Sequence, residues 1–230
     1  MLWTKLSDFV ALVLGERRKS TYSHLQDVAW LSLEIHRELS NPDIDRNQVM
    51  AVSWLYGVSK PKYDADGSIK LRIISFLQQQ GLDAELIMKI IERVSFSEKP
   101  CQGVKRRMWM EELGIGGLLV RDIVSDANML NVLGASGYDK CINYFHSKSP
   151  ELTIEEVLEV VRDKAVKSNL TSAESTMMTD PGKARAIPLV AELVSCLGFG
   201  YMTEKDMEGE VSGSNALTVE ALKRHDELWV

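Results

Sequence analysis

The chain has 230 residues, 45% of them hydrophobic, so it is long enough to bury a full core within one large domain. Its net charge of −6 argues against a general binding surface for nucleic acid or anionic membrane, because both need concentrated lysine and arginine. No apolar run is long enough to span a bilayer, so we expect no membrane partner and regard nucleic acid as an unlikely one.

Cysteine usage and the N-terminal stretch indicate a compartment. The three cysteines, Cys101, Cys141 and Cys196, are far apart and lack the paired spacing of a zinc site or a disulfide framework. The apolar stretch 1–14 is interrupted by Asp8 and lacks a basic leader or a small-residue cleavage site. We therefore expect reduced thiols in a cytoplasmic protein.

Apolar residues recur at helical spacing along most of the chain, and no strand alternation or internal repeat emerges. This periodicity predicts an all-α fold. In chain order, helices are expected over about 2–14, 20–39, 43–57, 69–80, 83–94, 118–133, 137–145, 154–161 and 179–197, and a short tail helix over 216–229.

Residues that favour helix ends set several of these boundaries. The predicted caps are Ser20 or Thr21, Asp43 or Asp45, Asp83, and Thr179 or Asp180 at N-termini, with Gly15, Gly57 and Gly81 at C-termini. Pro181 is expected at the first helical position of the last large helix, and Pro188 is expected to kink that helix.

Residues 98–117 combine one proline and four glycines with the basic run Lys105-Arg106-Arg107, followed by Trp109. This composition predicts a loop with at most one short helix. The basic residues could receive phosphate or RNA and Trp109 could stack on a base, although a charge run in a loop is usually only solvated.

The acidic and Gly/Ser-rich stretch 203–215 is typical of a linker. We therefore predict one helical domain over residues 1–202, and a linker with a short amphipathic tail helix over 203–230. The literal His225-Asp226 pair lies in that tail helix, where a surface position is the expected interpretation.

Four stretches, taken together, resemble the HD-domain metal-dependent phosphohydrolases. They are Tyr22-Ser23-His24, the run 52–63, the run 90–97 and the run 125–134. The resemblance covers about residues 20–200 and is greatest to the small stand-alone nucleotide-hydrolysing branch. It implies an HD-like helical fold with a pocket lined by His24, Tyr56, Gly57, Lys60, Lys62, Tyr63, Asp126, Asn128 and Asn131.

Members of that family hold a divalent metal with a first histidine, a His-Asp doublet and a distant aspartate. Here His24 and Asp126 match the first and last ligands, whereas the doublet position is Tyr56-Gly57. Lys60 stands where relatives carry a further aspartate, while the Lys-aromatic continuation survives as Lys62-Tyr63.

Other positions that are charged in the relatives have lost their charge here. Asn128 and Asn131 stand where relatives carry acids, and Leu189 stands where they usually carry an arginine. We therefore expect no cofactor, with Mn²⁺, Mg²⁺ or Co²⁺ as the alternative. Two interpretations of Lys60 stay equally open: a solvated turn residue, or a cation that pairs with Asp126 and lowers the pKa of that carboxyl.

Two functional hypotheses follow. The preferred one is a degenerate, catalytically silent HD-fold protein that binds a nucleotide or another phosphate-bearing small molecule, or a protein partner. The alternative is a nucleotide phosphohydrolase with a rebuilt metal site that contains His24 and Asp126. The doublet position separates them, because conventional catalysis requires side-chain ligands there. The oligomeric state is left open.

Overall fold

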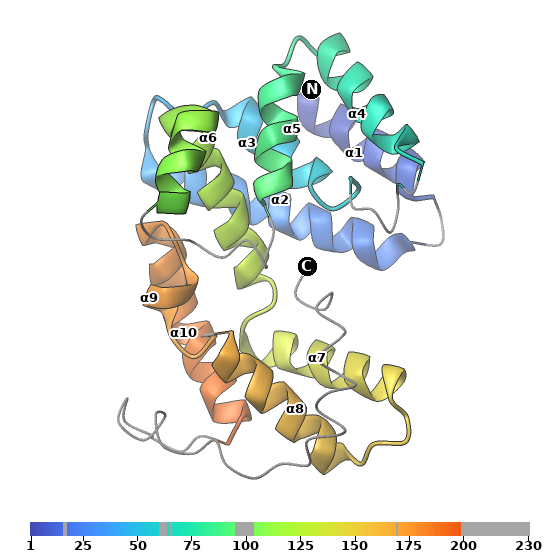
Figure 1. Cartoon of the computed structure of the whole chain (residues 1–230), viewed down its shortest axis with the longest axis vertical. Coiled ribbons are helices and arrows are strands. Elements are labelled where there is room, and N and C mark those ends of the chain that lie inside the picture. The colour runs from blue at the N-terminus through green and yellow to red at the C-terminus, as the bar shows by residue number, and fades with distance from the viewer. Residues whose placement is uncertain (16–17, 60–63, 65, 95–103, 169, 199–230) are drawn as a thin grey trace. The chain divides into compact units, whose positions relative to one another are not determined.

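The structure is a computed structural model, and it describes residues 1–15, 18–59, 64, 66–94, 104–168 and 170–198. Every regular element within these ranges is a helix, which confirms the predicted all-α class (Figure 1). The helices are α1 Leu2–Leu14, α2 Lys19–Leu39, α3 Arg46–Leu55, α4 Ser68–Gln79, α5 Ala84–Arg93, α6 Val104–Leu130, α7 Gly134–Lys148, α8 Ile154–Lys167, α9 Ala173–Thr176 and α10 Asp180–Cys196.

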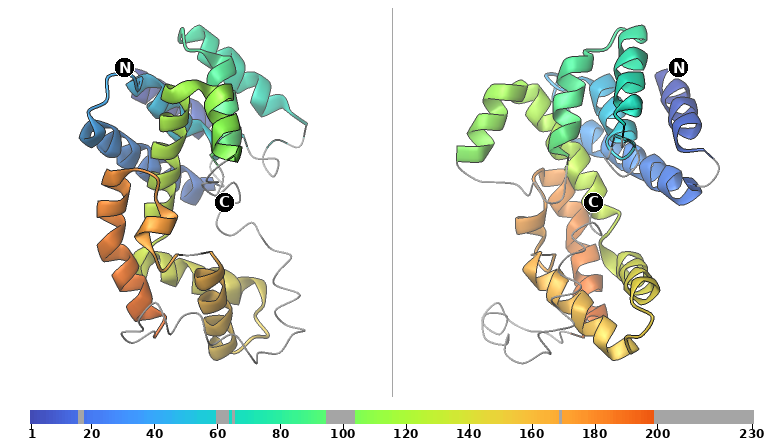
Figure 2. Two further views of the ribbon diagram at one scale, coloured as in Figure 1. Left: turned by 60° about the vertical axis from the view of Figure 1, so that its left-hand side comes forward. Right: turned by 45° about the vertical axis from the view of Figure 1, so that its right-hand side comes forward.

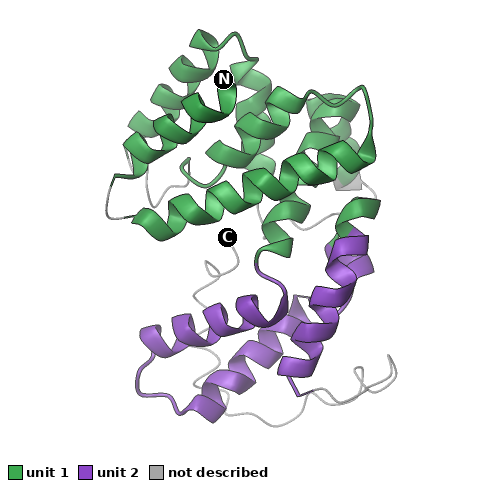
Figure 3. Cartoon of the chain, turned by 180° about the vertical axis from the view of Figure 1, so that it is seen from behind, with its two compact units in different colours: residues 1–131, 177–182 green, residues 132–176, 183–230 purple. Residues whose placement is uncertain are grey.

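The chain forms two compact units, shown in green and purple in Figure 3. Among the described residues, unit 1 contains those within 1–131 and 177–182, and unit 2 contains those within 132–176 and 183–198. The predicted linker and tail helix over 203–230 lie outside the described residues, so the proposed boundary at residue 202 stays a prediction.

The centre of unit 1 is α3, in which every residue from Val49 to Leu55 is buried. Helices α1, α2, α5 and α6 all contact it. Trp54 packs edge-on against Trp3 of α1, with ring centroids 5.2 Å apart, and also lies 5.5 Å from the ring of Tyr22 of α2. Because α3 is enclosed, its C-terminal end delivers Tyr56 and Gly57 into the interior.

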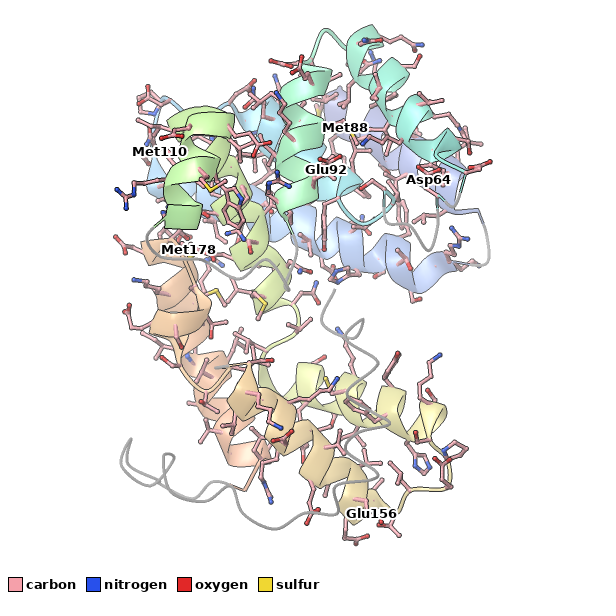
Figure 4. The ribbon with its side chains drawn as sticks, viewed as in Figure 1. Asp64, Met88, Glu92, Met110, Glu156 and Met178 are labelled. Carbon is pink, nitrogen blue, oxygen red and sulfur yellow. The ribbon has the colours of Figure 1, made fainter. Side chains whose placement is uncertain are left out.

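Local hydrogen bonds begin several helices where the sequence predicts. Asp45 accepts from the Asn47 amide at the start of α3, and Asp83 accepts from the Leu86 amide at the start of α5. Asp64, labelled in Figure 4, accepts from the amides of Ile69 and Lys70 at the start of α4. These carboxylates satisfy amide groups that the first helical turn leaves unpaired.

Two predicted boundaries of unit 1 are wrong in detail. Helix α2 begins at Lys19 after Arg18, so Ser20 and Thr21 lie inside the helix and neither caps it. The last large helix begins at Asp180, which places Pro181 at its second position. Thr179 is nevertheless the cap, because its hydroxyl accepts from the Gly182 amide.

The predicted loop over 98–117 is wrong from residue 104 onward, where α6 begins. Its glycines serve packing rather than chain flexibility. A Cβ on Gly116 would lie 2.9 Å from the Asp43 carbonyl oxygen, and a Cβ on Gly117 would lie 3.2 Å from the Leu113 Cβ. Only Gly114 breaks the helical conformation, with φ 69° and ψ 171°, and it divides α6 into two segments.

Unit 2 packs α7 against α8. Thr153 and Glu156 form a capping box at the start of α8 (Glu156 is labelled in Figure 4). The Arg162 guanidinium donates two hydrogen bonds to the Leu197 carbonyl oxygen, at 2.9 and 2.7 Å. This contact ties α8 to the chain immediately after α10. Helix α10 continues through Pro188. No described helix is long and apolar enough to cross a membrane.

Candidate functional site

The predicted site residues that the structure brings together come from three helices of unit 1. His24 lies half-buried on α2, Tyr56 lies buried at the end of α3, and Asn128 lies buried near the end of α6. Helices α2, α3 and α6 contact one another, which explains how residues 32 and 72 positions apart meet. Tertiary packing, rather than proximity in sequence, assembles this group.

A chain of hydrogen bonds runs through the three side chains. The Tyr56 hydroxyl donates to Asn128 Oδ1 at 2.9 Å and lies 2.8 Å from His24 Nε2. A phenol has one proton, and Tyr56 donates it to Asn128. His24 Nε2 must therefore be protonated and donate the second hydrogen bond to the Tyr56 hydroxyl oxygen. We refer to His24, Tyr56 and Asn128 as the tyrosine bridge.

Burial keeps the Tyr56 hydroxyl, the central group of the tyrosine bridge, in its neutral form. Desolvation raises the pKa of Tyr56 far above its ordinary value, because the phenolate would lose its hydration. Tyr56 therefore stays protonated in the folded protein. A protonated phenol is a poor ligand for a divalent cation, so Tyr56 is not suited to hold a metal at the position where the resemblance predicts one.

Gly57 completes the altered doublet and is also buried. A Cβ at this position would lie 2.6 Å from Leu25 Cδ2, and Leu25 is fully buried on α2. The end of α3 therefore packs against α2 at a distance that suits glycine. An aspartate here would require Leu25 to repack before its carboxylate could reach any site.

Asp126 makes a different set of contacts from Asn128. Its Oδ1 accepts from the Met178 amide at 2.8 Å, and its Oδ2 accepts from the Thr179 amide at 2.8 Å and the Thr179 hydroxyl at 2.7 Å. Asp126 and Asn128 are two positions apart on α6, and residues with that spacing project in different directions. The hydrogen bonds of the tyrosine bridge thus reach Asn128, while the carboxylate holds the segment 177–182, in which Met178 is labelled in Figure 4.

Close approach of Gly182 is part of this second contact. A Cβ on Gly182 would lie 2.9 Å from both Asp126 Cγ and Thr179 Oγ1. Glycine therefore allows the first turn of α10 to lie directly on the carboxylate. The glycine at position 182 therefore has a packing role in this chain.

The pKa of Asp126 is raised, which is opposite to the lowering that a pairing with Lys60 would produce. The pKa of Asp126 is raised to about 6, mainly because the carboxyl is buried and to a smaller extent by the Asp122 charge, while the hydrogen bonds from Thr179 and Met178 act in the opposite direction. Lys60, Lys62 and Tyr63 lie outside the described residues, so their part in a pocket stays a prediction. Asn131 is half-buried just beyond α6, and its backbone N–H donates to the Ala127 carbonyl oxygen.

Sequence reasoning missed a buried charge cluster in the same unit. The fully buried Arg121 donates through Nε to the Arg93 carbonyl oxygen at 3.0 Å and through NH1 to Asp122 Oδ1 at 3.0 Å. Arg106 donates to Asp122 Oδ2 at 2.7 Å. The available signal was the Arg121-Asp122 pair inside the apolar run 118–124, because a charged pair there must be neutralised internally.

This cluster corrects the expectation for the basic run. Trp109 is buried, and the Arg121 guanidinium covers its ring at 4.8 Å from the centroid. The indole face is therefore occupied by a cation from its own chain and is not available to stack on a base. Arg106 is likewise bound to Asp122, so it holds the first segment of α6 against the second.

Among the described residues, no three His, Cys, Asp or Glu side chains lie close enough together to hold a metal ion. His24 and Asp126, the two matches to family ligands, each bond to other groups of the chain. Searches among known protein families, among curated proteins and among solved structures find no match to this chain.

Proposed function

We propose that this chain is a catalytically silent, HD-like helical protein that acts as an interaction module. The observation that carries the proposal is the tyrosine bridge, in which the Tyr56 hydroxyl joins His24 Nε2 to Asn128 Oδ1. The bridge makes use of the polar atoms at the position where the resemblance predicts metal ligands. These hydrogen bonds would stabilise the site without the need for a dication.

The donor set does not fit a catalytic metal. Activation of water needs several side-chain ligands fixed in one geometry, since only a firmly held cation lowers the pKa of its bound water enough. Here Tyr56 stays protonated, Gly57 has no side chain, and Asp126 accepts three hydrogen bonds from Met178 and Thr179. These residues therefore favour a site without hydrolytic chemistry.

The same contacts favour a protein partner over a small ligand. Tyr56, Asn128 and Asp126 are all buried, and the hydrogen bonds given above already satisfy their central polar atoms. A nucleotide entering here would have to break those bonds and replace each of them. Burial raises the pKa of the Cys141 thiol to about 12, so this cysteine stays a protonated packing residue and is a poor nucleophile.

The test measures metal content and hydrolysis on one preparation. Protein purified without chelators should contain divalent metal far below one ion per chain. It should show no hydrolysis of a nucleotide panel above the protein-free blank when Mn²⁺, Mg²⁺ or Co²⁺ is added. Calorimetric titration with the same nucleotides should show no saturable heat.

The control is the His24→Ala variant, which removes the first match to a family ligand. Any residual hydrolysis in the wild-type preparation should persist in this variant, because it then comes from a contaminant. Metal-dependent turnover abolished by His24→Ala and by Asp126→Ala would instead establish the rebuilt phosphohydrolase. Saturable nucleotide binding without turnover would establish a silent small-molecule module.

A further inference from the structure

Helix α1 lies at an edge of unit 1, beside α4 (Figures 1 and 2). Its buried face is Leu6, Val10 and Leu14, which packs into the unit. Two contacts fix its position against α4: the Phe9 and Phe76 rings stack with centroids 4.5 Å apart, and Lys5 Nζ donates to Gln80 Oε1 at 2.8 Å. The side of α1 opposite the buried face is exposed.

That exposed side carries a regular stripe of four residues: Met1, Lys5, Asp8 and Leu12. The spacing of four, three and four places them on one line along the helix. Leu12 is 73% exposed, and Met1 is also exposed. We call these four residues the α1 stripe. These two apolar side chains stand at the two ends of the stripe, and the half-buried Phe9 and Phe76 rings lie beside it.

The α1 stripe is complementary to itself. Read in either direction, it has an apolar end, two opposite charges in the centre and another apolar end. When two copies pack antiparallel, the exposed Lys5 of each exchanges its hydrogen bond to Gln80 for Asp8 of the other copy, and Met1 of each faces Leu12 of the other. Parallel packing would place like charges together and is therefore disfavoured. This symmetry is what an isologous two-fold interface requires.

We propose that the α1 stripe is the contact of an antiparallel homodimer of this chain. The stacked Phe9 and Phe76 rings flank the stripe and extend its apolar area on one side. A 13-residue helix is only about 20 Å long, so this contact is smaller than a standard interface of about 1,600 Å². The dimer should therefore dissociate at about micromolar concentrations, and it would form whether or not the HD-like assignment holds.

A charge-exchange experiment by sedimentation equilibrium tests this dimer on the full chain. Lys5→Asp gives an all-acidic stripe and Asp8→Lys gives an all-basic stripe, so each variant alone should dimerise at least about tenfold more weakly than wild type. An equimolar mixture of the two should form a heterodimer of near wild-type strength, because opposite charges then face each other again. Circular dichroism of each variant checks that the helices persist.

Substitutions at two exposed leucines distinguish association through the α1 stripe from non-specific hydrophobic association. Leu12→Asp should abolish association, whereas Leu71→Asp should leave it unchanged, since Leu71 is 69% exposed on α4 but lies outside the stripe. A wild-type chain that stays monomeric at about 100 µM, well above the expected range, would overturn the dimer and leave the stripe to another partner. Failure of the mixture to associate, or equal loss with Leu71→Asp, would also overturn it.

Discussion

At the residue scale, the altered doublet is the most informative feature. Tyr56 is buried and stays protonated, and its hydroxyl links the side chains of His24 and Asn128 by hydrogen bonds. Gly57 beside it allows α3 to approach Leu25 of α2. Both residues therefore have a structural role at the position where the sequence resemblance predicts metal ligands.

Tyr56→Phe should destabilise unit 1, because it removes only the hydroxyl and takes from the buried Asn128 Oδ1 the hydrogen bond that Tyr56 donates. We expect a loss of about 1–3 kcal/mol in the free energy of unfolding, measured by urea denaturation. Tyr22→Phe is the matched control: its hydroxyl bonds to Ser7, but both residues are half-buried and water can replace the bond. A Tyr56→Phe loss no larger than the Tyr22→Phe loss would contradict a stabilising bridge.

Asp126 gives a prediction for the dependence of stability on pH. Its folded pKa of about 6 lies above the ordinary value of 3.8, so the folded state binds this proton more tightly than the unfolded state does. Its contribution to stability is therefore greatest below about pH 4 and falls as the pH rises to about 6. The two values differ by about two units, which corresponds to roughly 3 kcal/mol.

The measurement compares wild type with Asp126→Asn by urea denaturation between about pH 4 and about pH 7. Asparagine does not titrate, so the difference in unfolding free energy between the two proteins isolates this one carboxyl. Wild type should lose stability relative to the variant as the pH rises. A relative gain would mean that the folded pKa is lowered, as the Lys60 pairing predicts.

At the element scale, the kinked helix α6 organises unit 1. Gly114 has a non-helical backbone conformation that kinks α6. Gly116 and Gly117 let the helix pack closely against neighbouring residues. The two segments of α6 are then joined across the kink by Arg106 and Asp122. Arg121 adds a bond to the end of α5 through the Arg93 carbonyl. A charge cluster thus connects three stretches of helix.

Asp122→Asn should destabilise the fold strongly, because it leaves the fully buried Arg121 without a full counter-charge. Breaking a buried pair in this way costs about 3–5 kcal/mol. Glu112→Gln is the control, since it removes an ion pair with Arg93 that is partly exposed and should cost less than about 1 kcal/mol. Equal losses in thermal or urea unfolding would show that the buried cluster is not what joins these helices.

At the scale of the whole molecule, the chain is an acidic, all-helical protein with two compact units among its described residues. The functional residues considered above all belong to unit 1, including the short segment 177–182 that returns to it after α9. Unit 2 contributes its own packing through α7, α8 and Arg162. The HD-like assignment stays a prediction, since it depends on the order of sequence landmarks.

The sequence by itself determined the helical class and many helix ends, because these depend on local periodicity and on capping residues such as Asp45, Asp83 and Thr179. It also identified His24, Tyr56 and Asn128 as members of one group. It failed at residues 104–117, where glycines that normally indicate a loop instead allow close helix packing.

Tertiary structure alone decided how the polar side chains pair. The sequence shows that Asp126 and Asn128 are neighbours. Only packing determines that Asn128 is linked to His24 through Tyr56, whereas Asp126 bonds to Thr179. The direction of the Asp126 pKa likewise depends on burial, which no local pattern reveals. Hydrogen bonds and desolvation act over a few ångströms in space, so residues distant in sequence set them.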